Sequence, residues 1–596
     1  MEQIEKPTRW SLKDLLAEPV DQALAETFEK LDQALAGLEA LRDSLGPEIS
    51  IAEFKRVLAG VESVNRLTSR LEAYSDLLLT EDTQSPFALN LRDRINEVLT
   101  DSNNRMLFFD LWFKDLPDEA ANPLIEQSGD LRYFLEAMRQ FKPFTLSELE
   151  EKLINLKDVN GIDALVNLGE MITSNFVFTL EVDGEALSMT RDQLGGYFRH
   201  PSAEVRAGAY RELYRVVEQN SSVLAQIYLH RIRDWNAEAV ELRGYATPIS
   251  ARNLSNDLPD SVVDTLLDVC RNNVGIFQRY FQWKARWLGI PSGTLRRYDI
   301  YAPLVESDKT FEYGEARNLV MESFQNFSPH VADLAWRVFE ENHLDSESRQ
   351  GKRGGAFCYA PLPDLTPWVM VNYEGRARDI ATLAHELGHA IHNMLAGSHS
   401  IMTFHASLPL AETASVFAEI QLTDMLLEHE ADPAVRRDLL AYAIDDAYVT
   451  VIRQAYFTLF EREAYRLVEE GNSIEELSAA YMANLNEQFG DAVEISEEFK
   501  WEWLTVPHMV NVPFYTYAYS FGQLLVLALV QQYRLEGEAF VPKYLKILSY
   551  GGSESPVKIL AEAGIDVTSP EFWQGGFDFI QSMITELENL SEDNSL

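Results

Sequence analysis

Apolar side chains recur every three or four residues through most of this 596-residue chain, and that spacing limits the possible folds more than any other feature. A helix with this spacing carries its apolar side chains on one face, which it must bury. The pattern covers residues 12–45, 51–79, 85–114, 146–154, 261–288 and 311–342. It also covers a run to Glu241 that begins at Pro201-Ser202-Ala203-Glu204, a sequence typical of a helix start with a capping pair. We therefore predict a mainly α-helical protein.

Only short segments show the alternation of apolar and polar residues, or the β-rich composition, that is typical of strands. Residues 176–182 read Phe-Val-Phe-Thr-Leu-Glu-Val, and residues 368–373 read Trp-Val-Met-Val-Asn-Tyr. The length corresponds to about four domain-sized units of ~150 residues, or to one large multi-lobed protein. Candidate junctions lie at 183–196 and 345–355, where glycines and charges gather. We expect small β elements in a helical protein, one of them near residue 370.

The chain is strongly acidic, with 51 basic and 94 acidic side chains and a formal net charge of −43. Such a surface repels phosphate groups, so nucleic acid and anionic membranes are poor partners. The most apolar stretch, 514–530, is interrupted by Thr516, Ser520 and Gln523, and its unbroken part is far shorter than the ~20 residues of a membrane span. We expect no nucleic-acid partner and no membrane partner.

Two features of the sequence bear on the compartment. The two cysteines, Cys270 and Cys358, are too few for a disulfide framework and fit a reducing environment. The first residues lack the basic-then-apolar order of a secretory signal. Both features predict a cytoplasmic protein.

Histidine is scarce, with 11 in the chain, but five of them fall between His385 and His405. The first two belong to His385-Glu386-Leu387-Gly388-His389, which matches the H-E-x-x-H pattern of zinc proteases. Residues 377–396 contain no proline and end before a glycine, so we expect one helix there. Positions four apart share a helix face, so both imidazoles can bind one ion. Glu386 directly follows His385, so it lies close to the ion without having to bind it. A general base for a metal-bound water needs such a position.

A catalytic zinc needs a third protein ligand, and Glu412 is the candidate. It follows Pro409 at the start of a second helical pattern that runs to about Glu428. A helix packed antiparallel to the first would direct this carboxylate at the ion. Glu419, two turns further along the same face, suits a role in orienting a histidine. The rival third ligands are His399, His405 and Glu419, while His392 is either a neighbour of the site or a core residue.

These residues belong to a larger ordered set of motifs. The set comprises residues 298–303, 352–357, 382–392, 412–415 and 550–553, and His508 followed by 514–519. It resembles the oligoendopeptidase F branch of the thimet-oligopeptidase-like zinc metallopeptidase family. The resemblance covers residues 200–590, which would form the zinc metallopeptidase catalytic domain. A weaker similarity relates 112–181 to the N-terminal domain of oligopeptidase F, and we expect 1–110 to form an N-terminal helical region.

The resemblance implies a mainly α, multi-helical, two-lobed zincin peptidase with a deep substrate channel and a small β element beside the zinc-site helix. It implies one Zn²⁺ ion held by His385, His389 and Glu412, with Glu386 as the base that assists a zinc-bound water. The implied reaction is hydrolysis of internal bonds in short unfolded peptides, because a narrow channel excludes folded proteins.

The resemblance further implies that His508 and a nearby tyrosine stabilise the tetrahedral intermediate, with Tyr517 as the first choice and Tyr515 as the second. From the residues alone, His508 lies between Pro507 and Pro513 and is expected on a loop. The alternating tyrosines of this segment also fit one aromatic wall of a core.

Other functions fit parts of the pattern. A zinc metallocarboxypeptidase or another exopeptidase can use the same helix motif, but it needs a group that binds a free chain end. A peptide-binding protein without catalysis would not need Glu386 beside all three ligands, and a helical scaffold would not need a metal. Short peptides are the partners that we expect, and no motif indicates an oligomeric state.

Overall fold

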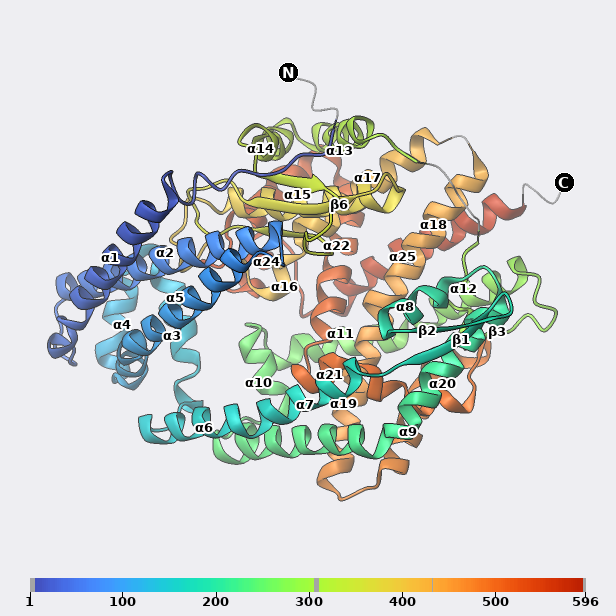
Figure 1. Cartoon of the computed structure of the whole chain (residues 1–596), viewed down its shortest axis with the longest axis horizontal. Coiled ribbons are helices and arrows are strands. Elements are labelled where there is room, and N and C mark those ends of the chain that lie inside the picture. The colour runs from blue at the N-terminus through green and yellow to red at the C-terminus, as the bar shows by residue number, and fades with distance from the viewer. Residues whose placement is uncertain (1–5, 305–309, 431, 593–596) are drawn as a thin grey trace. The chain divides into compact units, whose positions relative to one another are not determined.

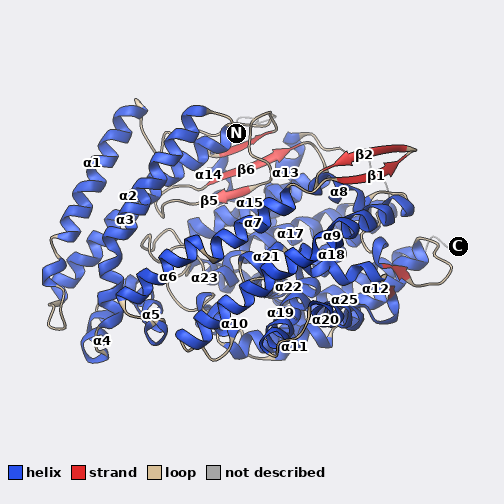
Figure 2. Cartoon of the chain, turned by 60° about the horizontal axis from the view of Figure 1, so that its bottom comes forward, coloured by secondary structure: helices blue, strands red, loops and turns tan. Residues whose placement is uncertain are grey.

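The computed structural model describes residues 6–304, 310–430 and 432–592, which are mainly helical with few, short strands (Figures 1 and 2). The predicted fold class, a mainly α protein with small β elements, is confirmed. The chain forms two compact units, each built from three separate stretches of sequence. The first unit comprises 1–142, 308–429 and 532–566, and the second comprises 143–307, 430–531 and 567–596. The domains expected at 1–110, 112–181 and 200–590 stay predictions.

In the first unit, an N-terminal layer of helices has α2 packed against both α1 and α3 (Figure 1). The elements of this unit are α1 (Val20–Glu39), α2 (Ile51–Glu81), α3 (Pro86–Asp115), α4 (Asp118–Glu126), α5 (Arg132–Gln140), α13 (Tyr313–Phe327), α14 (Pro329–Glu340), β4 (Leu344–Glu347), β5 (Phe357–Tyr359), β6 (Trp368–Tyr373), α15 (Ala377–Leu395), α16 (Leu408–Ala411), α17 (Thr413–His429), α23 (Val541–Ser549) and α24 (Pro556–Glu562). The strands form one sheet in the order β4-β6-β5, with β4 parallel and β5 antiparallel to β6.

In the second unit, α7, α19 and the 3₁₀ segment Glu497–Thr505 pack against the long helix α9. Its elements are α6 (Glu148–Asn160), α7 (Ile162–Ser174), β1 (Phe178–Val182), β2 (Glu185–Met189), α8 (Arg191–Gly196), α9 (Ala203–Trp235), α10 (Pro248–Ser255), α11 (Asp260–Asn272), α12 (Val274–Trp287), β3 (Leu295–Arg296), α18 (Pro433–Ala447), α19 (Arg453–Glu469), α20 (Ile474–Phe489), β7 (Val493–Glu494), α21 (Pro507–Asn511), most of α22 (Tyr517–Glu536) and α25 (Pro570–Glu592). Strand β1 pairs antiparallel with β2, and β3 pairs parallel with β7.

Both strands predicted from alternation are present. β6 has the predicted bounds, and its residues 368–371 are all buried. β1 begins two residues after the predicted start and forms a hairpin with β2. β6 leads through a short turn into α15, so the buried sheet positions the start of the helix that carries the H-E-x-x-H motif.

Local capping explains where several predicted helices begin. The hydroxyl of Ser50 accepts a hydrogen bond from the backbone N–H of Glu53 at the start of α2. The side-chain carboxylate of Glu53 accepts one from the backbone N–H of Ser50. Pro86 is the first residue of α3 and follows the N-cap Ser85. Proline is tolerated there because the N–H groups of the first turn have no partner within the helix. At α9 the predicted capping pair is wrong, because Ser202 precedes the helix but its side chain makes no capping hydrogen bond.

Two stretches expected to be helical are each divided into two helices. Residues 261–288 form α11 and α12, separated at Asn273 with φ −109° and ψ 7°. Residues 311–342 contain α13 and α14, separated at Ser328, which is extended because Pro329 disfavours a helical residue before it. The apolar spacing continues across both breaks because each helix of a pair buries one face, so periodicity alone does not reveal the break.

The most apolar stretch of the sequence lies largely in α22, inside the second unit. Residues 524–530 are all buried there. A side chain at Gly576 of α25 would stand 3.0 Å from the backbone oxygen of Leu524, so the two helices pack closely. Among residues 6–304, 310–430 and 432–592, no helix is both long and apolar enough to cross a membrane.

A buried ion pair fixes the sheet edge before the motif helix. Asp345 of β4 and Lys352 are both fully buried, and Nζ of Lys352 lies 2.8 Å from Oδ1 of Asp345. Arg349 donates to both oxygens of the same carboxylate at 2.7 Å, and Lys352 also donates to the carbonyl of Val371 in β6 at 2.7 Å. Because these charges are removed from water, each depends on its partners for stabilisation.

Replacing Asp345 with Asn is therefore expected to destabilise the first unit by about 3–5 kcal/mol, since the charge of Lys352 stays buried without a counter-charge. Thermal and urea unfolding of the intact chain check this. The matched control is Asp364→Asn, which removes an exposed carboxylate paired with Arg66 and should cost about 0–1 kcal/mol. Equal effects of the two substitutions would contradict the prediction.

Candidate metal centre

Helix α15 presents two histidines on one face. Its first turn is fixed by Asp379, whose carboxylate accepts hydrogen bonds from the backbone N–H groups of Glu374 (2.9 Å) and Arg376 (3.0 Å). The ring centroids of His385 and His389 lie 4.8 Å apart, with an interplanar angle of 81°. Both rings are partly exposed, so water and a ligand can reach the face that they share.

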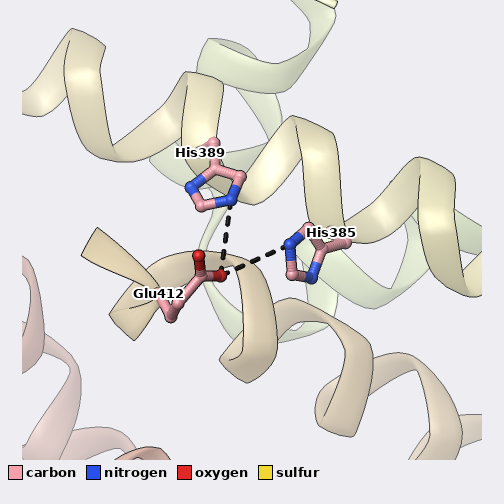
Figure 3. A group of neighbouring side chains, drawn as sticks. All are labelled: His385, His389 and Glu412. Atoms are coloured by element: carbon pink, nitrogen blue, oxygen red, sulfur yellow. Dashed lines mark ion pairs between the residues drawn. The ribbon is translucent and has the colours of Figure 1, made fainter. Parts of the chain in front are cut away.

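Glu412 completes this group from the junction between α16 and α17 (Figure 3). One carboxylate oxygen, Oε2, lies 3.4 Å from Nε2 of His385 and 3.4 Å from Nε2 of His389. The hydroxyl of Ser415 donates to the same oxygen at 2.7 Å and orients the carboxylate. In a tetrahedral zinc site with bonds of about 2.0–2.2 Å, ligand atoms lie about 3.3–3.5 Å apart. The donor set and its spacing therefore fit a zinc ion.

Glu419 binds the other nitrogen of His385. Its Oε1 accepts a hydrogen bond from Nδ1 of that ring, and it lies two turns beyond Glu412 on α17. A neutral imidazole that donates from Nδ1 has its Nε2 lone pair available for a metal. The contact is the one expected of a carboxylate that fixes the tautomer and orientation of a metal ligand.

Burial and the carboxylates shift the proton affinities of the group. Burial lowers the pKa of His389 to about 4, despite the nearby Glu412. Burial also opposes the charged form of His385, but its hydrogen bond to Glu419 and the surrounding carboxylates outweigh it and raise its pKa to about 9. Burial raises the pKa of Glu386 to about 7, against the attraction of His385, and Glu412 and Glu419 add to the increase. Glu386 is thus suited to both accept and release a proton near neutral pH.

The rival ligands His399 and His405, and His392, which was expected beside the site or in the core, have different surroundings. Nδ1 of His399 lies 2.6 Å from Oδ1 of Asp130, and its Nε2 lies 2.9 Å from the carbonyl oxygen of Ser549. Burial lowers the pKa of His392 to about 3 and that of His405 to about 4, so both rings are neutral. Among the described residues, none of these three rings joins the ligand group of α15 and Glu412.

Gly388, between the two candidate ligands, allows α17 to approach α15 closely. A Cβ at this position would stand 2.6 Å from the backbone oxygen of Ala414 and 2.6 Å from Cα of Ser415. No other residue fits without moving one helix away from the other. The glycine of the motif therefore sets the distance at which Glu412 meets the imidazoles.

His508 lies in the second unit, in the short helix α21, so the loop expected from its flanking prolines is wrong. Pro507 opens that helix, since its missing N–H is not needed in a first turn. The ring of Tyr515 stacks on His508 with centroids 5.8 Å apart, and the hydroxyl of Tyr519 lies 3.4 Å from its Nε2. Tyr517 is fully buried, and its hydroxyl accepts a 2.8 Å hydrogen bond from Nδ2 of Asn256.

Sequence reasoning did not select Tyr519 as a neighbour of His508. The signal for it was its spacing of four residues from Tyr515, which places both rings on one side of the chain where α22 begins. The alternation of the three tyrosines also fitted one aromatic wall of a core. Because the segment is helical from Tyr517 onward, the middle tyrosine turns into the core and its two neighbours face His508.

A set of buried hydrogen bonds, here called the polar ladder, fixes the backbone of the segment that carries these tyrosines. It comprises the side-chain contacts of Glu461, Thr458, Thr516 and Ser520. Oε1 of Glu461 accepts from the backbone N–H of Phe514 at 2.9 Å, where Phe514 has a φ of 57°. The hydroxyls of Thr458 and Thr516 lie 2.8 Å apart, and that of Ser520 donates to a backbone carbonyl at 2.7 Å. The ladder stabilises a left-handed backbone conformation that is costly for a residue other than glycine.

Comparison with known proteins identifies the family. Residues 197–579 match the sequence model of peptidase family M3. The chain belongs to peptidase family M3. This membership confirms the expectation of a metalloendopeptidase of the oligoendopeptidase F type, because relatives that carry this name align over nearly the whole chain.

Two curated relatives illustrate the similarity. The chain is 25% identical to the chromosomal oligoendopeptidase F of Lactococcus lactis subsp. cremoris, over 99% of this chain and 98% of that protein. It is 24% identical to oligopeptidase PepF of Bacillus subtilis, over 98% of this chain and 87% of that protein.

Solved structures share the fold. A Chlamydophila abortus protein assigned as a peptidase superposes with a TM-score of 0.87 at 22% identity, covering 98% of each chain. Oligoendopeptidase F from Enterococcus faecium superposes with a TM-score of 0.72 at 24% identity, covering 96% of this chain and 99% of that one. The fold of these solved structures therefore covers nearly the whole chain.

Replacing Glu419 with Ala is expected to weaken zinc binding about 10–100-fold, because the ring of His385 loses the partner that orients it. Competition with a chromophoric chelator measures the zinc dissociation constant of the chelator-treated protein. Glu428→Ala is the matched control, since Glu428 is exposed on the same helix. A dissociation constant that is the same for both variants would rule out this role for Glu419.

Proposed function

We propose that this family M3 peptidase is a zinc-dependent oligoendopeptidase that hydrolyses internal bonds of short unfolded peptides. The observation that carries the proposal is the convergence of His385, His389 and Glu412, with Glu386 beside them on α15. Two imidazoles, one carboxylate and a neighbouring general base are the groups that metal-assisted peptide hydrolysis requires. The names of the relatives support peptides as the substrate class.

In the proposed mechanism, the three ligands hold one Zn²⁺ ion and Glu386 moves the proton. When bound, zinc makes water acidic enough to act as a nucleophile near neutral pH and polarises the scissile carbonyl. Glu386 removes a proton from the attacking water and passes it to the nitrogen of the leaving amine. Burial raises the pKa of Glu386, which favours the uptake of the proton that it then passes on. Glu419 keeps the ring of His385 in the tautomer that leaves Nε2 free.

His508 and a tyrosine are proposed to donate hydrogen bonds to the oxyanion that forms as water attacks. One such donor often contributes about 3 kcal/mol to catalysis. The stacking of Tyr515 on His508 favours Tyr515 for this role. The complete burial of Tyr517 and the bond that its hydroxyl accepts from Asn256 favour a structural role for that residue, although the sequence had placed it first.

The substrate and the compartment complete the proposal. Short peptides are the proposed partners, and the substrate channel implied by the family resemblance stays a prediction. Cys270 and Cys358 are both free thiols, which supports a reducing, cytoplasmic location.

Replacing Glu386 with Gln is expected to lower kcat by about 10²–10⁴-fold while zinc content is retained, because the amide cannot take the proton. Peptide turnover and elemental analysis of the same preparation measure both quantities. Glu428→Gln, at an exposed position outside the site, is the matched control. Full activity of Glu386→Gln would disprove the assignment of the base.

Mass spectrometry of a peptide library tests endopeptidase activity directly. Peptides blocked at both ends are expected to be cut at internal bonds as fast as free peptides, since the proposed endopeptidase reaction involves no free terminus. A chelator should abolish the cleavage and added zinc should restore it. Cleavage restricted to peptides with a free carboxyl end would instead support a metallocarboxypeptidase.

A further inference from the structure

A second group of possible metal ligands lies in the first unit and shares no residue with the centre on α15. Asp14, Glu341 and His343 each place one ligand atom within 4.8 Å of the other two. Nε2 of His343 lies 3.1 Å from Oδ2 of Asp14. Asp14 lies in the N-terminal segment before α1. Glu341 directly follows α14, and His343 directly precedes β4.

The hydrogen bonds of His343 show which of its ring nitrogens has a lone pair. Nδ1 lies 2.8 Å from the carbonyl oxygen of Thr366, and a carbonyl oxygen can only accept, so Nδ1 carries a hydrogen. In a neutral ring, Nε2 then has a lone pair, which faces the carboxylate of Asp14. A nitrogen lone pair and a carboxylate oxygen that face each other in this way can both bind one cation placed between them.

The donor atoms of the group suit a divalent metal ion. Two carboxylates, those of Asp14 and Glu341, share the site with one imidazole. One imidazole with two carboxylates is a ligand set that zinc and neighbouring first-row ions accept.

The imidazole is held rigidly in the direction that such a site needs. His343 is only 1% exposed, and its ring stacks on Trp368 with centroids 3.9 Å apart. Its backbone N–H donates to the carbonyl of Val338, and its carbonyl accepts from the N–H of Val369, both at 2.9 Å. A ligating histidine whose other nitrogen donates to a carbonyl is the usual arrangement in metal sites.

The carboxylates are positioned through their backbones and face solvent. Arg70 donates to the backbone oxygens of Asp14 at 2.9 Å and of Leu15 at 2.7 Å, which fixes the turn that carries Asp14. Arg337 donates to Oε1 of Glu341 at 3.1 Å. Because both side chains are exposed, an ion can enter from solvent and water can occupy the remaining coordination positions.

We propose that Asp14, Glu341 and His343 form a second metal site for a zinc-type divalent cation. The ion would link the N-terminal segment to the end of α14 and to the chain that leads into β4. Its role would be to stabilise the first unit, because the site contains no general base comparable with Glu386.

Zinc stoichiometry of the full-length chain tests this site. The protein is stripped with a chelator, reloaded with micromolar zinc, desalted and analysed by inductively coupled plasma mass spectrometry. Asp14→Asn/Glu341→Gln is expected to hold one zinc fewer per chain than the unmodified protein, with peptidase activity retained. Glu340→Gln, at an exposed position next to Glu341, is the matched control and should hold the full amount.

A second variant separates the two sites. His385→Ala/His389→Ala should lose the zinc of the α15 centre and keep one ion, and added zinc should raise its melting temperature. Adding Asp14→Asn and Glu341→Gln to that variant should remove both the ion and the thermal shift. Equal zinc content in the unmodified protein and in Asp14→Asn/Glu341→Gln would overturn the second site, whatever the α15 centre binds.

Discussion

The close packing of α17 on α15 is the contact on which the candidate metal centre depends. Backbone atoms of Ala414 and Ser415 occupy the space that a side chain at Gly388 would need. At this distance Glu412 reaches both imidazoles, and Glu419 reaches the far side of one of them. A ligand set assembled from two rigid helices needs little reorganisation when an ion binds, which favours tight and specific coordination.

The second unit positions its candidate residues by a different physical means. Phe514 takes a left-handed backbone conformation, and the buried carboxylate of Glu461 holds its N–H there. Tyr515 follows directly and stacks on His508, while Tyr517 turns into the core. Burial raises the pKa of Glu461 to about 8, and its Oε1 accepts the bond from Phe514. The polar ladder thus fixes which of the three tyrosines accompany the histidine.

The local parts of the site were predictable from the sequence, and the tertiary parts were not. The spacing of His385, Glu386 and His389 depends only on helix geometry, and Glu412 followed from the need for a third ligand near a second helix. By contrast, the burial of Tyr517 depends on the packing of α22 inside the second unit, which no local pattern records. The helix breaks at Asn273 and Ser328 were missed because apolar periodicity continues across them.

The most direct test of the account is an X-ray data set collected on crystals of the purified protein on both sides of the zinc absorption edge. The account predicts an anomalous peak about 2.0–2.2 Å from Nε2 of His385, Nε2 of His389 and Oε2 of Glu412, present only above the edge. Crystals of zinc-loaded protein with no anomalous peak between these three atoms would contradict the central claim.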